Sequence, residues 1–285
     1  MSQDRIAFIG AGNMATSLIG GLLATGREPD SITAADPDPE QLTRVGKLGV
    51  VSTHDNAEAV AGAAVVVLAV KPQVLGKVVS DLAGKLNASQ LLLSIAAGVP
   101  ADAISRWAEA PLGVVRCMPN TPALFGAGMT AMFANASVTP QQRVSAAGIA
   151  EAVGEVVWVD TEAEIDAVTA VSGSGPAYFF YLMEQMIAAG IDLGLAPETA
   201  RTLTLQTARG AAAMAIESDA APAQLRLNVT SPGGTTEAAL AVFESAGLAA
   251  TIHNALTAAA RRSQELAVEH GSPQPVATAT RTNTE

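Results

Sequence analysis

The chain lacks most of the residues on which disulfide-bonded, metal-binding and membrane proteins depend. Its 285 residues include one cysteine, Cys117, so no intramolecular disulfide can form, and no Cys/His cluster has the spacing of a zinc site. No apolar run is long enough to cross a membrane, and no basic stretch followed by an apolar run marks an export signal. We therefore expect a cytoplasmic protein that binds no metal and no membrane.

Positive charge is also scarce. The chain has 16 lysines and arginines against 27 aspartates and glutamates, a net charge of -11, which leaves no basic field to attract a nucleic acid backbone. Hydrophobic residues make up 49% of the sequence, much of it alanine, and charged residues make up 15%. This composition suits closely packed helices or a subunit interface, so we expect a homo-oligomer and no nucleic acid partner.

The first part of the chain alternates short β-branched runs with stretches of helical character. Nearly continuous apolar runs such as 65–69 indicate strands that are buried on both faces, as in a parallel sheet covered by helices. This pattern predicts an N-terminal doubly wound, Rossmann-like α/β sheet. The predicted strands are 5–9, 31–35, 64–69, 91–95 and 114–116, with possible edge strands at 129–133 and 156–159 and a helix over about 140–153.

The strand signal stops after Val159, and helical patterns take over. Thr161 and Glu164 have the spacing of a capping box, so we place the domain boundary there. The segment 178–183 is apolar around most of a helix, which is tolerated only when other helices or another subunit enclose it. The predicted helices are 161–171, 176–189, 197–217, a short one from Pro222, 236–245 and 248–270. We predict a dinucleotide-binding domain over 1–160, an all-helical domain over 161–271 and a disordered tail over 272–285.

A glycine-rich turn follows the first predicted strand directly and opens a helix. Gly10 permits the tight turn, Gly12 lets the backbone approach a pyrophosphate, and the small Ala15 allows close packing of helix on strand. The phosphates would then lie at the positive end of the helix. In this context a nicotinamide dinucleotide site explains the turn better than packing alone. The predicted cofactor contacts here are Gly10, Ala11, Gly12, Asn13 and Met14.

Asp36 ends the second predicted strand, 24 residues after Gly12. An acidic side chain there can accept hydrogen bonds from the adenosine ribose, which favours NADH. An ordinary strand-to-helix turn over 36–39 explains the same residues equally well. No arginine that could grip a 2′-phosphate follows before Arg44.

Further cofactor candidates lie in three segments, two of which follow predicted strands. Ala69 and Lys71, followed by Pro72, close a strand at its carboxyl end, where ligands of doubly wound sheets bind, although a surface lysine is the alternative. Asn56 could reach the nucleotide or cap a helix. Asn120 belongs to a proline-stiffened loop over 118–122 that would face the same crevice.

Two glycine- and hydroxyl-rich segments, 172–176 and 231–236, precede predicted helices. Backbone N–H groups at a helix N-terminus and orientable hydroxyls together suit a substrate carboxylate. Capped helix starts are the alternative and would explain either segment alone, but the density of glycines and hydroxyls in the second favours a ligand. The histidines His54, His253 and His270 lie outside both segments, so no general acid is evident. Reduction of a cyclic imine needs less, because its ring nitrogen can arrive protonated and a hydroxyl suffices to orient it.

In this order, segments 10–15, 69–72, 94–98, 116–122, 171–178 and 231–236 closely resemble those of pyrroline-5-carboxylate reductases, and the likeness extends from about 5 to about 266. The most specific parts of this likeness are residues 118–122, Met-Pro-Asn-Thr-Pro, and residues 231–236, Ser-Pro-Gly-Gly-Thr-Thr. The resemblance implies that NADPH or NADH gives hydride to the C=N carbon of Δ1-pyrroline-5-carboxylate, which forms L-proline in the last step of proline biosynthesis. It also implies an interlocked dimer through the helical domain, often assembled into a decamer.

The resemblance also implies roles for individual residues. Thr236 would hydrogen-bond the ring nitrogen, as the catalytic residue. The substrate residues would be Asn228, Ser231, Gly233, Gly234 and Thr235, with Ser174 added from the first glycine-rich segment. The cofactor would contact residues 10–14 together with Asn56, Ala69, Lys71 and Pro72. The strand-end pattern adds Asp36 and Asn120. No metal ligand is implied.

Two other functions are compatible with the same sheet. A β-hydroxyacid dehydrogenase would need a lysine base on the long helix after the first glycine-rich segment, yet residues 176–217 contain no lysine. A non-catalytic nucleotide-sensing module would bind the cofactor without turnover, but no attached effector segment is evident in the sequence.

Overall fold

A computed structural model describes residues 4–271, which form two compact units. The first unit contains the described residues up to Gly173 together with those from Ala259 onward. The second unit runs from Ser174 to Ala258. The predicted tail over 272–285 lies outside the described residues.

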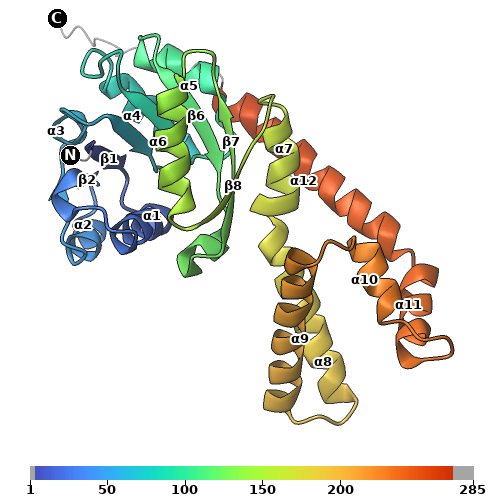
Figure 1. Cartoon of the computed structure of the whole chain (residues 1–285). Coiled ribbons are helices and arrows are strands. Elements are labelled where there is room, and N and C mark those ends of the chain that lie inside the picture. The colour runs from blue at the N-terminus through green and yellow to red at the C-terminus, as the bar shows by residue number, and fades with distance from the viewer. Residues whose placement is uncertain (1–3, 272–285) are drawn as a thin grey trace, which may run out of the picture. The chain divides into compact units, whose positions relative to one another are not determined.

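The first unit is built on an eight-stranded sheet with the order β3-β2-β1-β4-β5-β6-β7-β8 (Figure 1). Neighbouring strands are parallel except β6 and β7, which run antiparallel. The predicted doubly wound, Rossmann-like sheet is therefore confirmed. The strands are β1 (Ile6–Ile9), β2 (Ile32–Ala35), β3 (Val51–Thr53), β4 (Val65–Leu68), β5 (Leu91–Ser94), β6 (Gly113–Met118), β7 (Gly128–Ala134) and β8 (Gly154–Trp158).

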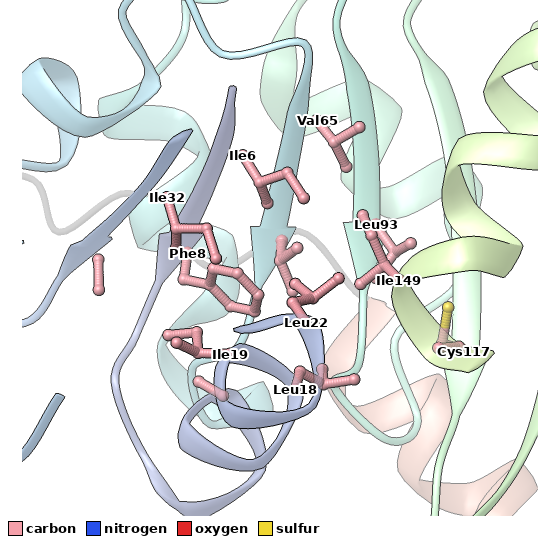
Figure 2. Close-up of a cluster of buried hydrophobic side chains, with 14 of the residues drawn as sticks. Ile6, Phe8, Leu18, Ile19, Leu22, Ile32, Val65, Leu93, Cys117 and Ile149 are labelled. Atoms are coloured by element: carbon pink, nitrogen blue, oxygen red, sulfur yellow. The ribbon is translucent and has the colours of Figure 1, made fainter. Parts of the chain in front are cut away.

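Helices cover both faces of this sheet. One face packs against α1 (Asn13–Ala24), α2 (Pro39–Gly46) and α6 (Pro140–Glu151), and the other against α3 (Asn56–Val60), α4 (Pro72–Asp81) and α5 (Ala101–Ala108). Figure 2 shows the first face, where Phe8 of β1 packs beside Ile19 of α1. The neighbours Ala7 and Ile9 belong to the opposite cluster. Burial of both faces explains why these strands are apolar without alternation.

The second unit is helical throughout its described length. It contains α8 (Gly175–Asp192), α9 (Pro197–Glu217), α10 (Pro222–Asn228), α11 (Thr235–Ser245) and the first part of α12 (Leu248–Gly271). The predicted all-helical character is confirmed, and the bounds predicted for α9 are those observed. Phe179 and Phe180 of α8 are 64% and 62% exposed in the single chain. Phe179, Phe180 and Tyr181, which we call the aromatic face of α8, are all exposed. Large apolar side chains exposed next to one another indicate a surface that another chain covers.

The segment that joins β8 to α8 differs from its prediction. Only half of the expected capping box forms: Glu164 Oε2 accepts from the Thr161 N–H at 2.7 Å. The Thr161 hydroxyl donates to the same carboxylate and does not accept the Glu164 N–H, so α7 (Glu164–Val168) has no side-chain cap. The expected loop over 172–176 is also wrong. Residues Thr169–Gly173 form a π-helical turn, η3, and Gly175 begins α8. Contacts of this turn with the end of β6, described below, outweigh the loop preference of its serines and glycines.

Hydrogen bonds attach both flanks of the helical region to the sheet unit. Glu162 Oε1 accepts from the Ala101 N–H at 2.7 Å and from Arg116 Nη1 at 2.8 Å. Ser263 Oγ lies 2.6 Å from Asp166 Oδ1. The compact units therefore do not divide at residue 160, and the predicted domain boundaries of 1–160 and 161–271 stay a prediction.

Among residues 4–271 no single helix has the length and composition to cross a membrane, whereas α11 and α12, bent by 55°, pass together on length and composition alone. Within the same residues, no group of three or more His, Cys, Asp or Glu side chains is arranged to hold a metal ion.

Candidate active site

The two glycines of the first turn are required for different physical reasons. Gly10 has a φ of +100°, and a Cβ there would lie 2.7 Å from the Ala69 carbonyl oxygen, so only glycine fits. Gly12 has an ordinary φ of -66°, and a Cβ there would meet nothing within 4 Å. The space in front of Gly12 is therefore open to a ligand, as a close approach by a pyrophosphate requires.

The start of α1 suits an anion. Gly12 is its N-cap, no side chain caps it, and its first turn carries no acidic residue. The first N–H groups of a helix have no intrahelical partner, and the helix dipole adds a partial positive charge there. An open space before these donors fits the pyrophosphate of a dinucleotide.

Ala11 is held from both sides by charged residues. Its N–H donates to Asp36 Oδ2 at 2.8 Å, and its carbonyl accepts from Arg44 Nη2 at 3.0 Å. Arg44 Nη1 also donates to Asn13 Oδ1 at 2.9 Å. The glycine turn is thus fixed between the end of β2 and the helix α2.

Asp36 also closes the turn into α2. Its Oδ1 accepts from the Asp38 N–H at 2.9 Å, and Asp38 in turn caps α2 by accepting from the Glu40 N–H at 2.9 Å. The helix-start reading of this segment is therefore confirmed. The ribose contact of Asp36 stays a prediction.

Sequence reasoning gave Arg44 no place at the glycine turn, although Arg44 lies against it. Its guanidinium bonds to Gln41 as well as to the turn, and its Nε is buried without a hydrogen-bond partner. Gln41 and Arg44 are three residues apart on α2, which puts both on one helix face. That spacing was the sequence signal that could have placed Arg44 at the glycine turn.

The other predicted cofactor residues lie at the carboxyl edge of the same sheet. The Ala69 N–H donates to the Ile9 carbonyl at 2.8 Å, which brings the end of β4 against the glycine turn. Lys71 is exposed and precedes Pro72, the first residue of α4, whose start no side chain caps. Asn56 opens α3 but does not cap it, since Asp55 accepts from the Ala57 N–H.

Asn120 also lies at this edge, and its side chain is engaged within the protein. Its Oδ1 accepts from the Met129 N–H at 2.9 Å, and its Nδ2 donates to the Ser172 carbonyl and hydroxyl at 3.3 Å. A Cβ on Gly173 would lie 2.3 Å from Met118 Cε, so η3 fits tightly on the end of β6. Asn120 thereby joins β7 to η3.

The second predicted ligand loop begins with a tight turn. The Gly234 N–H donates to the Ser231 carbonyl at 3.0 Å, and Gly233 has a φ of +69°. Proline second and a positive-φ glycine third are typical of a type II turn. A Cβ on Gly234 would lie 2.9 Å from the Ser231 carbonyl oxygen, so this glycine too is sterically required.

The helix α11 begins directly after this turn, at Thr235, without a side-chain cap at Gly234. The Gly233 N–H donates to Glu237 Oε2 at 2.7 Å, a contact that sequence reasoning missed. A glutamate three residues after an N-cap was the signal that could have revealed it. The N–H groups of Thr235 and Thr236 occupy the first turn, where no intrahelical partner exists.

The remaining candidates are less directly defined. Asn228 ends α10, and its Oδ1 accepts from Gln224 Nε2 at 2.8 Å. Ser174 is the single residue between η3 and α8.

Burial raises the pKa of the Cys117 thiol, against a smaller opposite effect of Arg116, so this cysteine is no nucleophile.

An uncapped glycine-rich helix start on a doubly wound sheet, followed by a helical unit with an open aromatic face, defines a dinucleotide-dependent oxidoreductase. Residues 162–266 match the family described as pyrroline-5-carboxylate reductase dimerisation, and residues 5–98 match NADP oxidoreductase coenzyme F420-dependent. The chain belongs to the pyrroline-5-carboxylate reductase family, so the predicted family, enzyme class and NAD(P) dependence are confirmed.

Relatives match along nearly the whole chain. A pyrroline-5-carboxylate reductase of Pseudomonas aeruginosa is 54% identical over 95% of this chain and 100% of its own length. The structure of one from Coxiella burnetii has a TM-score of 0.89 at 44% identity and covers 93% of this chain and 99% of its own. A Plasmodium falciparum pyrroline carboxylate reductase with NADP bound has a TM-score of 0.84 at 29% identity, covering 94% and 99%. These findings favour the reductase over the β-hydroxyacid dehydrogenase and the sensing module.

Proposed function

We propose that this chain reduces the C=N bond of Δ1-pyrroline-5-carboxylate to L-proline, the last step of proline biosynthesis. The main support for this activity is the 231–236 loop, in which a tight turn leads into an uncapped helix start with two threonines. Such a start offers N–H donors to a carboxylate and hydroxyls to a ring nitrogen. When bound, NADPH or NADH supplies the hydride that the imine carbon accepts.

The cofactor is proposed to lie along the carboxyl edge of the sheet. The N–H groups at the start of α1 would hold the pyrophosphate, with Gly12 as the point of closest approach. Asp36 would accept from the adenosine ribose through the lone pairs that Ala11 and Asp38 leave free. The proposed cofactor residues are Gly10, Ala11, Gly12, Asn13, Met14, Asp36, Asn56, Ala69, Lys71, Pro72 and Asn120.

The substrate carboxylate is proposed to bind at the start of α11. Thr235 and Thr236 would donate their N–H groups and Ser231 its hydroxyl, while Gly233 and Gly234 keep the turn in shape. The Thr236 hydroxyl would orient the ring nitrogen, which makes Thr236 the catalytic residue. Asn228 and Ser174 complete the proposed substrate residues.

The residues 162–266 are a dimerisation region of this family. For this chain we propose a cytoplasmic homodimer that uses the aromatic face of α8 and assembles further into a homodecamer. The open face of α8 supports the dimer, and the low share of charged residues supports the larger assembly.

The test is a turnover assay with the purified protein. Pyrroline-5-carboxylate with NADH or NADPH should consume the reduced nicotinamide and form L-proline, and kcat/KM for the two cofactors would give the preference. Cofactor binding without turnover by folded protein would instead support a sensing module.

A further inference from the structure

The loop proposed to hold the substrate carboxylate contains a carboxylate of its own chain. Glu237, in the first turn of α11, accepts the Gly233 N–H at 2.7 Å. Neither the established family assignment nor the proposed contacts give this side chain a role.

This bond decides which backbone donors the loop offers. The Gly233 N–H is taken by Glu237, and the Gly234 N–H by the Ser231 carbonyl. The next donors along the chain, on Thr235, Thr236 and Glu237, are in the helix's first turn and have no intrahelical acceptor. A substrate carboxylate with its two oxygens can therefore be held by the Thr235 and Thr236 donors, which directly follow the turn.

We infer that Glu237 is a positioning residue for the substrate site: by tethering Gly233 to α11, it fixes the turn so that the Thr235 and Thr236 donors stay aligned. The inference rests on the proposed function. Two consecutive glycines would otherwise leave the turn with wide backbone freedom. The contact resembles the capping box, in which a glutamate at the third helical position reaches back to the helix start.

A competing role would be a latch in which Glu237 occupies the place of the substrate carboxylate. The observed contacts favour positioning, because Glu237 and the turn hydrogen bond at Gly234 are satisfied together and leave Thr235 and Thr236 free of both. The two roles predict opposite changes in KM for the imine.

The experiment compares Glu237→Ala, Glu237→Asp and Glu237→Gln in the imine-reduction assay. Loss of the tether in Glu237→Ala should raise KM for pyrroline-5-carboxylate roughly fivefold to tenfold, the effect of losing one helix-cap hydrogen bond. KM for NAD(P)H should not change, because the loop has no proposed cofactor contact. Glu237→Asp should resemble Glu237→Ala because it is too short, and Glu237→Gln should stay near wild type because its amide oxygen still accepts.

Glu244→Ala is the matched control, an exposed glutamate further along α11. An unchanged or lowered imine KM in Glu237→Ala overturns the inference, and a lowered KM in both Glu237→Ala and Glu237→Gln establishes the latch instead. If Glu237→Ala fails to fold, Glu237→Asp against Glu237→Gln gives the same comparison. Failure of the wild-type protein to reduce the imine would refute the proposed function, whereas active wild type with unaffected variants would refute only the role of Glu237.

Discussion

Gly10 and Gly12 are separated by one residue, yet they meet different constraints. Glycine is required at position 10 by its positive φ and by the nearby Ala69 carbonyl. At position 12 the protein itself imposes no such limit, so glycine is required there only for a ligand to come close. Sequence spacing identified both as parts of a dinucleotide turn. It could not separate the residue that folding requires from the residue that ligand binding requires, because that distinction depends on what lies opposite each Cα.

Gly10→Ala and Gly12→Ala should therefore fail in different ways. Gly10→Ala combines a positive φ with a backbone clash and should lower the free energy of unfolding by about 2 kcal/mol or more. Gly12→Ala should leave stability nearly unchanged but weaken NAD(P)H binding roughly tenfold or more, since one good ligand contact is worth about that factor. Urea unfolding and cofactor titration distinguish the two, and equal loss of stability in both variants would contradict this division.

The charge on Asp36 should influence the choice between NADH and NADPH. Asp36→Asn keeps an oxygen acceptor for the Ala11 or Asp38 N–H but removes a negative charge from the place proposed for the ribose. The ratio of kcat/KM for NADPH over NADH should therefore rise, by roughly fivefold or more for about 1 kcal/mol of removed repulsion. Asp38→Asn, in the same turn, is the control, and a ratio that stays constant would remove Asp36 from the ribose site.

Cys117 should be unreactive in the folded protein. Burial raises the pKa of its thiol, so the thiolate that reacts with disulfide reagents is suppressed until the chain unfolds. Because the folded state holds this proton more tightly, stability should be unaffected below the unfolded pKa of about 8.5 and should fall as pH rises beyond it. The slope should be shallower in Cys117→Ala, and rapid labelling of native protein by a thiol reagent would contradict the assignment.

Among the secondary-structure elements, long or doubly buried ones could be read from the sequence and short or exposed ones could not. The strand β4 stands out as an apolar run, and Pro197 marks the start of α9. The strand β3 has three residues, and Val51 is 43% exposed, so it carries no periodic signal. The π-helical turn η3 was taken for a loop because its conformation depends on Met118 and Asn120, which are distant in sequence.

The contacts made by Glu162 join the start of α5, the strand β6 and the segment before α7. The Arg116 side chain is 7% exposed, so Glu162→Ala would leave a buried guanidinium unpaired. We expect the free energy of unfolding to fall by about 3 kcal/mol, measured by urea denaturation. Arg116→Met combined with Glu162→Ala should recover part of this loss. Lys77→Ala, at an exposed ion pair, should change stability by less than about 0.5 kcal/mol, and a comparable loss there would show that burial is not the cause.

For the molecule as a whole, the most consequential surface is the aromatic face of α8. Sequence periodicity indicated that this helix must be enclosed, but it could not say whether the cover comes from the same chain or from another. Family membership assigns the region to dimerisation. The identity of the covering surface depends on an assembled partner, which no single-chain pattern encodes.

Phe180→Glu should therefore dissociate the dimer. A charged side chain replaces an aromatic ring that is 62% exposed in the single chain, and burying that charge against an apolar partner is costly. Sedimentation analysis should show monomer at concentrations where the wild-type protein is assembled. Val144→Glu, at a similarly exposed apolar position on α6 of the sheet unit, is the matched control. Unchanged mass for Phe180→Glu would place the dimer contact elsewhere.

The double restraint on Ala11 has a kinetic consequence. Since its N–H and carbonyl are already bonded to Asp36 and Arg44, the turn has little conformational entropy left to lose when a dinucleotide arrives. Cofactor binding should then need no slow rearrangement of the turn. The observed rate constant of binding should rise linearly with cofactor concentration without reaching a plateau. Affinity differences between the two dinucleotides would appear mainly in how long each one stays bound.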